Sequence, residues 1–204
     1  MLPKAVLDKI QYFNKQKYDL KNDEIVLEEK SNSGKAVLKC ILSKDTVILH
    51  DPEKNTLPYL DEHIPNASKC ADKFLFELDN DGKWIVHIME FKKTINLSSL
   101  KKSKIQFIMG IYNARAVAGF LNICLKDIYV YSVYRDDRIK SMQDEPLIAM
   151  RQANSNPNDI RTINDWNRGR CHLNLDLEEK VYQHIKIQLN QNGNGECALM
   201  QPDK

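Results

Sequence analysis

Two apolar segments joined by a tight-turn sequence are the feature that most constrains the fold of this chain. Residues 73–78 (KFLFEL) and 84–91 (WIVHIMEF) are rich in aromatic, β-branched and other apolar residues, and Asp79-Asn80-Asp81-Gly82 lies between them. Runs of this kind on either side of a turn signal predict a β-hairpin. A three-residue loop over 80–82, with the glycine in the left-handed conformation, is a favoured connection.

This loop also fixes which residues face each other across the hairpin. It pairs Phe74 with Ile88, and two residues further toward the open end it places Asp72 opposite Glu90. Side chains alternate along a strand, so Lys92 shares the face of Glu90. A register slip of one residue would put Asp72 and Glu90 on opposite faces. The sequence therefore predicts a polar cluster of two acids and one lysine at the open end of an apolar hairpin.

The residue types in this cluster suit metal-assisted phosphodiester chemistry. Two carboxylates are hard oxygen ligands of the kind that Mg²⁺ or Mn²⁺ prefers. A bound divalent cation lowers the pKa of its water and stabilises charge on phosphoryl oxygens. The lysine can orient the attacking water or stabilise developing charge. The alternative is a structural ion pair at a strand end, which perturbs pKa values in the same way.

The rest of the chain alternates between predicted helices, strands and polar loops. Asn96 or Ser98 can cap a long helix that ends near Asn122. That helix is long enough to cross over between parallel strands. The other expected elements are a helix over 2–13, a loop over 14–23, a hairpin of 24–30 with 35–42, strands at 46–49 and 127–134, a loop over 51–69, short helices at 144–153 and 157–166, and a strand or helix over 179–189.

These elements predict one α/β domain with a central mixed β-sheet flanked by helices. At 204 residues the chain fits a single domain over 1–189, with a core at about 2–135 and a C-terminal extension over 136–189. The segment 190–204 is polar and glycine-containing, and it is expected to be a flexible tail.

Bulk composition excludes several function classes and points to a cytoplasmic protein. The net charge of +2 is not that of a polybasic protein, so any contact with nucleic acid must come from a local patch. The N-terminal segment lacks the features of a signal peptide, and no apolar run reaches membrane-spanning length. The five cysteines show no zinc-ligand spacing and are expected to be reduced thiols. His87 lies on the strand face opposite Glu90 and is expected to be a core residue.

In its order of elements and its polar residues, the chain resembles the PD-(D/E)xK nuclease superfamily, whose restriction-endonuclease-like core runs αβββαβ. Asp72, Glu90 and Lys92 carry the resemblance, within the sequences KCADKFLFEL and WIVHIMEFKK. It implies that Asp72 and Glu90 bind Mg²⁺ or Mn²⁺ and that Lys92 assists the water. Gln106 stands where many relatives carry a supporting glutamine in the following helix.

The chain also departs from the pattern of that superfamily. Ala71 stands where a proline often precedes the first acid, and Gly110 stands where some exonuclease branches carry a tyrosine. Relatives often add a glutamate from the first helix, where this chain offers only Asp8. A further metal ligand is therefore left open by the sequence, as is membership of the exonuclease branch.

A basic patch is expected next to this cluster, from Lys93, Lys101, Lys102 and Lys104. A nuclease needs such a patch to hold the phosphate backbone. The resulting hypothesis is a magnesium-dependent DNA nuclease, most simply an endonuclease in restriction, repair or phage defence. RNA is left open as a substrate, and a homodimer is compatible with this hypothesis. The alternatives are a non-catalytic nucleic-acid-binding or assembly module on the same fold, and an unrelated α/β interaction protein.

Overall fold

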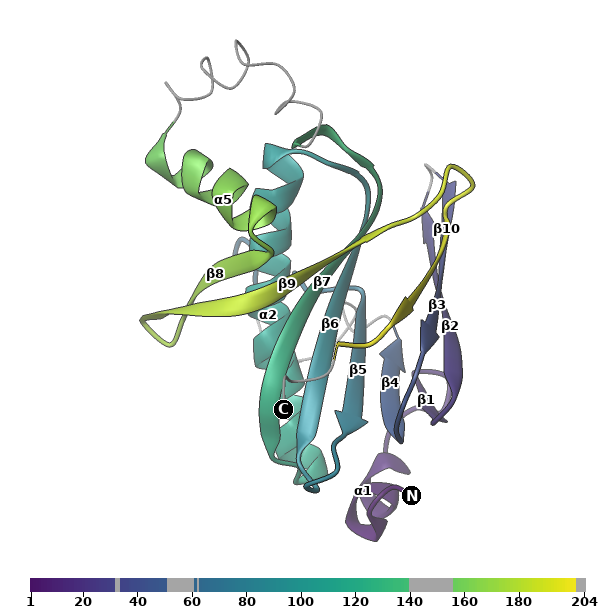
Figure 1. The fold of residues 1–204 in the computed structure, drawn as a ribbon. Coiled ribbons are helices and arrows are strands. Elements are labelled where there is room, and N and C mark those ends of the chain that lie inside the picture. Colours follow the sequence, from purple (N-terminus) through teal and green to yellow (C-terminus); the bar gives the residue numbers. More distant parts are fainter. Residues whose placement is uncertain (32–33, 51–60, 62, 140–155, 201–204) are drawn as a thin grey trace.

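A computed structural model of the chain describes residues 1–31, 34–50, 61, 63–139 and 156–200. The larger of its two sheets has seven strands in the order β1-β4-β5-β6-β7-β9-β8, and the smaller has three in the order β10-β3-β2 (Figure 1). The seven strands are β1 (Tyr18–Lys21), β4 (Thr46–His50), β5 (Lys73–Leu78), β6 (Trp84–Ile95), β7 (Leu125–Asp137), β9 (Glu178–Gln188) and β8 (Arg170–Leu175). The three strands of the smaller sheet are β10 (Asn194–Ala198), β3 (Gly34–Ile41) and β2 (Glu24–Ser31). The described helices are α1 (Lys4–Ile10), α2 (Leu97–Leu121) and α5 (Pro157–Asn167).

The central hairpin of β5 and β6 has the predicted loop and register. Phe74 pairs with Ile88, as the loop length required. The Asp79 N–H donates to the Lys83 carbonyl at 2.8 Å, which leaves residues 80–82 as the loop. Gly82 has a φ of 74°, the left-handed conformation that this loop demands.

The helix that follows β6 connects two parallel strands. Asn96 caps α2, because its side chain accepts from the Ser99 N–H at 2.9 Å while the Ser99 hydroxyl accepts from the Asn96 N–H at 2.8 Å. The helix ends at Asn122, which is left-handed at φ 57°. β7 then pairs in parallel with β6, so the predicted crossover is confirmed.

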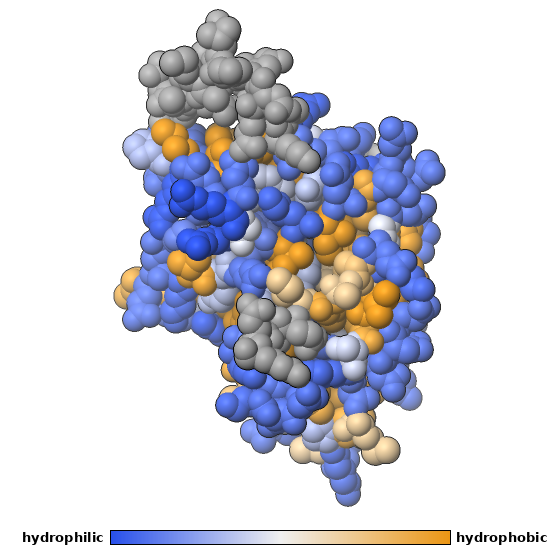
Figure 2. All heavy atoms as spheres, in the orientation of Figure 1, coloured by the Kyte–Doolittle hydropathy of each residue, from blue (hydrophilic) through white to orange (hydrophobic). Residues whose placement is uncertain are grey.

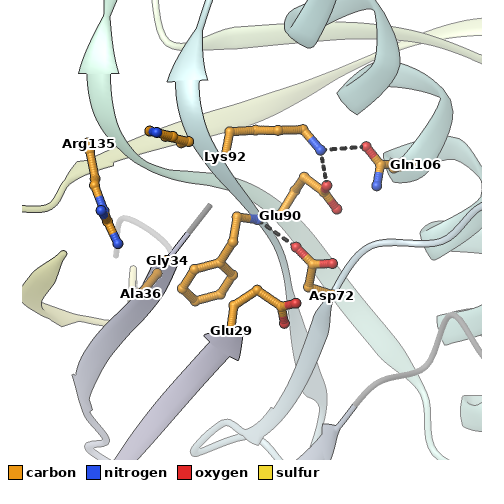
Figure 3. A pocket seen from close by; sticks show the side chains of 10 residues that line it. Glu29, Gly34, Ala36, Asp72, Glu90, Lys92, Gln106 and Arg135 are labelled. Atoms are coloured by element: carbon orange, nitrogen blue, oxygen red, sulfur yellow. Dashed lines mark hydrogen bonds and ion pairs between the residues drawn. The ribbon is translucent and has the colours of Figure 1, made fainter. Parts of the chain in front are cut away.

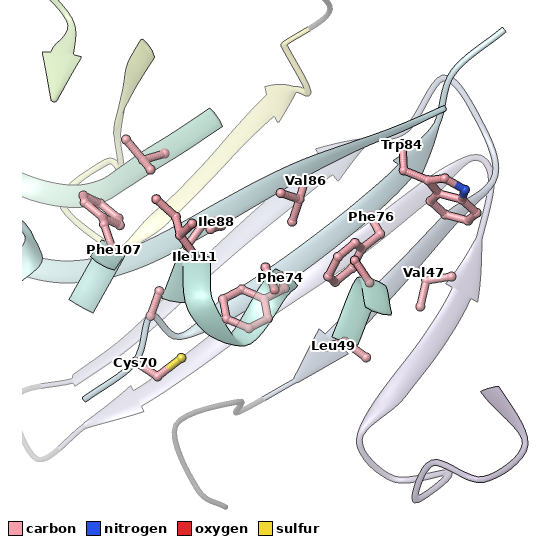
Figure 4. Close-up of a cluster of buried hydrophobic side chains, with 14 of the residues drawn as sticks. Val47, Leu49, Cys70, Phe74, Phe76, Trp84, Val86, Ile88, Phe107 and Ile111 are labelled. Carbon is pink, nitrogen blue, oxygen red and sulfur yellow. The ribbon is translucent and has the colours of Figure 1, made fainter. Parts of the chain in front are cut away.

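The core between α2 and the large sheet is built from the alternate positions of β5 and β6 (Figure 4). Phe74, Ile88 and Phe107 are completely buried in it. Gly110 lets the helix approach the sheet closely, because a Cβ there would lie 3.2 Å from Ile88 Cγ2 and 3.4 Å from Phe74 Cε1. Tight packing of this kind fixes the height of α2 above the end of the hairpin.

The two faces of the large sheet are covered by different kinds of structure. Helices α1 and α2 pack on one face and share a single apolar cluster. The other face carries the β2–β3–β10 sheet, through a second cluster that includes Leu27, Leu38, Leu75 and Met89. In Figure 2 apolar residues gather near the region where Figure 1 shows the two sheets meeting, within a mostly hydrophilic surface. The expected mixed α/β sheet is confirmed, but the described helices flank it on one face only.

Three other expectations about the chain need correction. Residues 18–21 form strand β1, paired with β4, inside a segment expected to be a loop. Residues 194–198 form β10, paired in parallel with β3, inside the segment expected to be a flexible tail. Strand β8 was not anticipated. The helix expected at 144–153 lies outside the described residues. No described helix has the length and apolar character needed to cross a membrane.

The β8–β9 hairpin contains a strained position that yields a stability prediction. Asp176 and Leu177 form a two-residue loop with φ values of 55° and 66°, and the Leu177 side chain is fully exposed. Because a left-handed conformation costs an L-residue roughly 1–2 kcal/mol, Leu177→Gly should raise the free energy of unfolding by up to about 1 kcal/mol. Urea denaturation measures the change. Leu177→Ala keeps the strain and should show no such gain; an equal gain in both variants would contradict this explanation.

Candidate active site

The structure brings Asp72 and Glu90 to the same place at the open end of the β5–β6 hairpin. Asp72 immediately precedes β5, while β6 continues past that end. The Asp72 N–H donates to the Met89 carbonyl at 3.0 Å, and the Phe91 N–H donates to Asp72 Oδ2 at 2.7 Å. The Asp72 side chain thus satisfies a backbone donor of β6 where β5 no longer continues, and this holds its carboxylate beside Glu90.

Lys92 lies two residues after Glu90 on β6 and is paired with it. Its Nζ forms an ion pair with Glu90 and donates to Gln106 Oε1 at 2.9 Å. Gln106 in turn donates from Nε2 to the Cys70 carbonyl at 3.3 Å. The glutamine therefore links α2 to both the lysine and the segment before Asp72, and the predicted set of four residues converges.

Glu90 has an unusual environment for a carboxylate. Its residue is 1% exposed, and among the described residues nothing donates a hydrogen bond to its Oε2 atom. Burial raises the pKa of the Glu90 carboxyl to about 8, with repulsion from Asp72 adding to the increase and with Lys92 and a hydrogen bond from Gln106 opposing it. A buried oxygen without a partner beside a second carboxylate is a state that a bound cation would relieve.

The four residues lie along a pocket of about 280 Å³ (Figure 3). It extends from the helix-covered face, around the edge of β6, to the β2–β3 hairpin of the smaller sheet. Its lining residues are Glu29, Gly34, Ala36, Asp72, Glu90, Phe91, Lys92, Lys93, Gln106 and Arg135. The site is thus an open, strongly polar pocket rather than an enclosed apolar cavity.

The donor set of this pocket fits a divalent cation that is only partly coordinated by protein. Within the described residues no three His, Cys, Asp or Glu side chains are grouped closely enough to form a complete metal cage. Magnesium commonly uses only one or two carboxylates and completes its shell with water and substrate phosphate. Asp72 and the unpartnered Oε2 of Glu90 match that requirement.

The predicted basic patch is divided by the structure. Lys93 lines the pocket. Lys101 instead pairs with Asp159 at 2.6 Å, and Lys104 pairs with Asp165 at 3.2 Å, so both are directed toward α5. Lys102 is exposed and does not line the pocket. The expectation of one continuous lysine patch around the site is therefore wrong, because helical periodicity turns these lysines toward different neighbours.

Two charged residues of the pocket were not anticipated from the sequence. Glu29 comes from β2, where its carboxylate lies 3.5 Å from the ammonium of Lys73, and Arg135 comes from near the end of β7. In the sequence Arg135 is followed by Asp136 and Asp137, a pattern typical of a self-neutralising strand exit rather than of a site. Only the packing of the smaller sheet against the larger one reveals that both residues face the pocket. Asp8, the acid of the first helix, is exposed and does not line it.

The opposite face of the hairpin carries a separate buried polar cluster. His87 is completely buried, with Nδ1 2.8 Å from the Tyr131 hydroxyl and Nε2 3.4 Å from Glu77 Oε2. Burial lowers the pKa of His87, which favours the neutral ring. The prediction that His87 is a core histidine is confirmed, and Glu77 does not contribute to the pocket.

The chain matches no protein-family model, no curated protein and no solved structure. Its class is therefore defined by architecture and chemistry alone. It is an α/β protein with a mixed sheet whose hairpin end holds two carboxylates, a lysine and a glutamine at one polar pocket.

Proposed function

We propose that this protein is a metal-dependent nuclease that hydrolyses DNA phosphodiester bonds, most simply as an endonuclease. The observation that carries the proposal is the buried, unpartnered Oε2 of Glu90 beside Asp72, with Lys92 paired to Glu90 at an open pocket. Two acids and a lysine at the open end of one hairpin supply the groups that phosphodiester hydrolysis requires.

Each residue of the site has a defined role in this proposal. Asp72 and Glu90 hold Mg²⁺ or Mn²⁺, which supplies Lewis-acid stabilisation of the phosphate and an acidified water. Lys92 orients the attacking water and stabilises the charge that develops on the phosphoryl oxygens. Gln106 keeps the ammonium of Lys92 in place through the 2.9 Å contact, and the Phe91 N–H keeps the Asp72 carboxylate turned toward the site.

The connectivity of the fold supports the same proposal. Leaving aside β1 and the smaller sheet, the chain runs α1, β4, β5, β6, α2 and β7, with β4–β5–β6 as an antiparallel meander and β7 parallel to β6. The same αβββαβ order is expected of a restriction-endonuclease-like core, which supports the proposed likeness. That likeness expects two acids and a lysine on this hairpin, so a role in restriction, repair or phage defence is proposed by analogy. A homodimer would allow both strands of a duplex to be cut.

One observation favours a second candidate, a non-catalytic nucleic-acid-binding or assembly module on the same fold. Lys92 is paired directly with Glu90, and the ammonium and carboxylate satisfy part of each other's charge. A purely structural ion pair would have this appearance. Such a module would bind DNA or a protein partner through the pocket without breaking a bond.

Incubation with supercoiled plasmid tests the proposal directly. Mg²⁺ or Mn²⁺ should convert the plasmid to nicked and linear forms, and EDTA should stop the reaction, because the two carboxylates alone cannot activate water. Parallel reactions with linear duplex, single-stranded DNA and RNA identify the substrate. Plasmid that stays supercoiled while linear DNA shortens would indicate an exonuclease. DNA binding without cleavage under every condition would favour the second candidate, and neither binding nor cleavage would reject both.

A further inference from the structure

Two cations line the pocket on the side away from Lys92 and Gln106, where Glu29 is the acid contributed by the smaller sheet (Figure 3). They are Arg135 at the end of β7 and Lys93 on β6, beside the β2–β3 hairpin. Neither side chain forms an ion pair with an acid in the part of the chain that the structure describes, whereas Lys101 and Lys104 are both paired. Two cations without acidic partners among the described residues therefore line the same pocket as Asp72 and Glu90.

Arg135 is held firmly on this side of the pocket by backbone groups. Its Nη2 donates to the Lys35 carbonyl of β3, and its own carbonyl accepts from Gln188 Nε2 at 3.0 Å. A guanidinium has five N–H donors, so the contact with Lys35 leaves others for a ligand. Its place at the edge of the pocket is thus fixed by strands of both sheets.

The turn before β10 can lie this close to the guanidinium only because residue 193 is glycine. A Cβ at Gly193 would lie 2.6 Å from Arg135 Nη2 and 2.5 Å from the Lys35 carbonyl oxygen. Gly193 also has a φ of 80°, which L side chains rarely adopt. Any other residue at this position would displace either the arginine or the backbone that holds it.

We propose that Arg135 and Lys93 bind a backbone phosphate of the nucleic-acid strand, next to the phosphate that is cleaved. This inference rests on the proposed function. A planar guanidinium matches the geometry of phosphate oxygens, and an arginine without an acidic partner among the described residues is suited to binding an anion. Such contacts fix the register of a strand without reading its sequence. The smaller sheet thereby becomes part of the substrate site, since it places the arginine.

Salt-dependent DNA binding by charge variants tests this assignment. The probe is a fluorescein-labelled duplex oligonucleotide, followed by fluorescence anisotropy in Mg²⁺ over a range of NaCl concentrations. All proteins carry Lys92→Met to prevent cleavage. Arg135→Gln should weaken binding by about tenfold and reduce the slope of log affinity against log salt by about 1. Arg135→Lys should keep most of the slope, and Lys93→Gln should reduce it.

A matched arginine elsewhere separates a phosphate contact from a general loss of charge. Arg115→Gln makes the same charge change on α2. Arg115 does not line the pocket, and its Nη1 lies 2.7 Å from Asp176 Oδ2. This variant should leave affinity and slope close to the parent values. Equal effects of Arg135→Gln and Arg115→Gln would overturn the proposal, as would a parent protein that does not bind the probe.

A glycine pair tests the positioning of Arg135 without removing its charge. Gly193→Ala should weaken binding about as much as Arg135→Gln. Gly82→Ala places an alanine at a similar φ of 74°, but nothing lies within 4 Å of its Cβ, so it should affect stability alone. Thermal unfolding confirms that each variant is folded. Plasmid cleavage that survives Arg135→Gln, with an unchanged salt slope, would remove this inference and leave the nuclease intact. DNA binding that depends on Arg135, with no cleavage by the parent protein, would keep the phosphate contact and reject the nuclease activity.

Discussion

Lys92→Met is expected to reduce metal-dependent DNA cleavage by roughly a thousandfold, within the range that a positioned proton-transfer or charge-stabilising group contributes. The Lys92 ammonium pairs with Glu90 and lies 2.9 Å from Gln106 Oε1, so it is held where a water bound near the two carboxylates would be oriented. Methionine keeps the length of the side chain and removes its charge. The measurement is kcat and KM on plasmid in Mg²⁺, and the loss should fall on kcat.

A lysine in a comparable ion pair provides the control for this variant. Lys126 lies 3.1 Å from the buried carboxylate of Asp79, near the hairpin loop and away from the pocket. Lys126→Met should keep kcat near the parent value while losing a similar ion pair. Cleavage by Lys92→Met at the rate of Lys126→Met would show that the ammonium of Lys92 is structural, and would remove it from the proposed chemistry.

Glu90→Gln is expected to make the protein more stable and inactive at the same time. The pKa of the Glu90 carboxyl is raised to about 8, chiefly by burial and then by Asp72, from an ordinary value of 4.5. Between these two pH values the folded state holds a proton that the unfolded state has released. The free energy of unfolding therefore falls as pH rises through this window, and the full cost of the buried charge is reached above about pH 8.

Glutamine occupies nearly the same volume and carries no charge at any pH, so the variant avoids this cost. In metal-free buffer at pH 8 or above, Glu90→Gln should gain on the order of a few kcal/mol over the parent. The difference between the two proteins should shrink as the pH is lowered toward 5. Thermal and urea unfolding across this pH range measure the effect. Glu178→Gln is the control, because that carboxylate is 73% exposed.

Adding Mg²⁺ distinguishes a metal site from a structural ion pair. A cation that binds only the folded state stabilises it by an amount that grows with the logarithm of one plus its concentration over Kd. Mg²⁺ should therefore raise the Tm of the parent at pH 8 and have little effect on Glu90→Gln, which should also fail to cleave DNA. If the Lys92–Glu90 pair is purely structural, Glu90→Gln should instead destabilise the protein. Mg²⁺ should then have the same effect on the Tm of the parent and of the variant. A gain in stability with loss of activity is the behaviour of a site that keeps an unfavourable charge for function.

The two expected results depend on different properties of the same pocket. The effect of Lys92→Met depends on where an ammonium is held, and the effect of Glu90→Gln depends on the burial of a carboxylate. One can fail without the other. A stabilised Glu90→Gln variant beside a fully active Lys92→Met variant would keep the metal site and transfer the orientation of water to another group, such as Gln106, whose Oε1 lies 2.9 Å from that ammonium.

The hairpin of β5 and β6, and with it the meeting of Asp72, Glu90 and Lys92, was determined by the sequence alone. The loop over 80–82 fixes the pairing, and side-chain alternation then fixes the face, because both depend on local geometry. The start of α2 follows similar short-range rules: the sequence offers Asn96 or Ser98 as its cap, the structure uses Asn96, and Gln106 lies almost three turns along the helix. These rules depend only on residues close in the chain, so the sequence of each segment is sufficient to predict them.

Only the tertiary structure decided what surrounds that cluster. Glu29 and Arg135 reach the pocket because a second sheet packs across the end of the first, and the β10 strand that completes it lies in a segment whose composition suggested a flexible tail. Lys101 and Lys104 leave the site because acids on α5 pair with them. Pairing between segments this distant in the chain depends on which surfaces remain unburied once the local elements have formed. No local sequence pattern encodes this long-range packing. The meeting of Asp72, Glu90 and Lys92 could therefore be predicted from the sequence, whereas the positions of Glu29 and Arg135 could not.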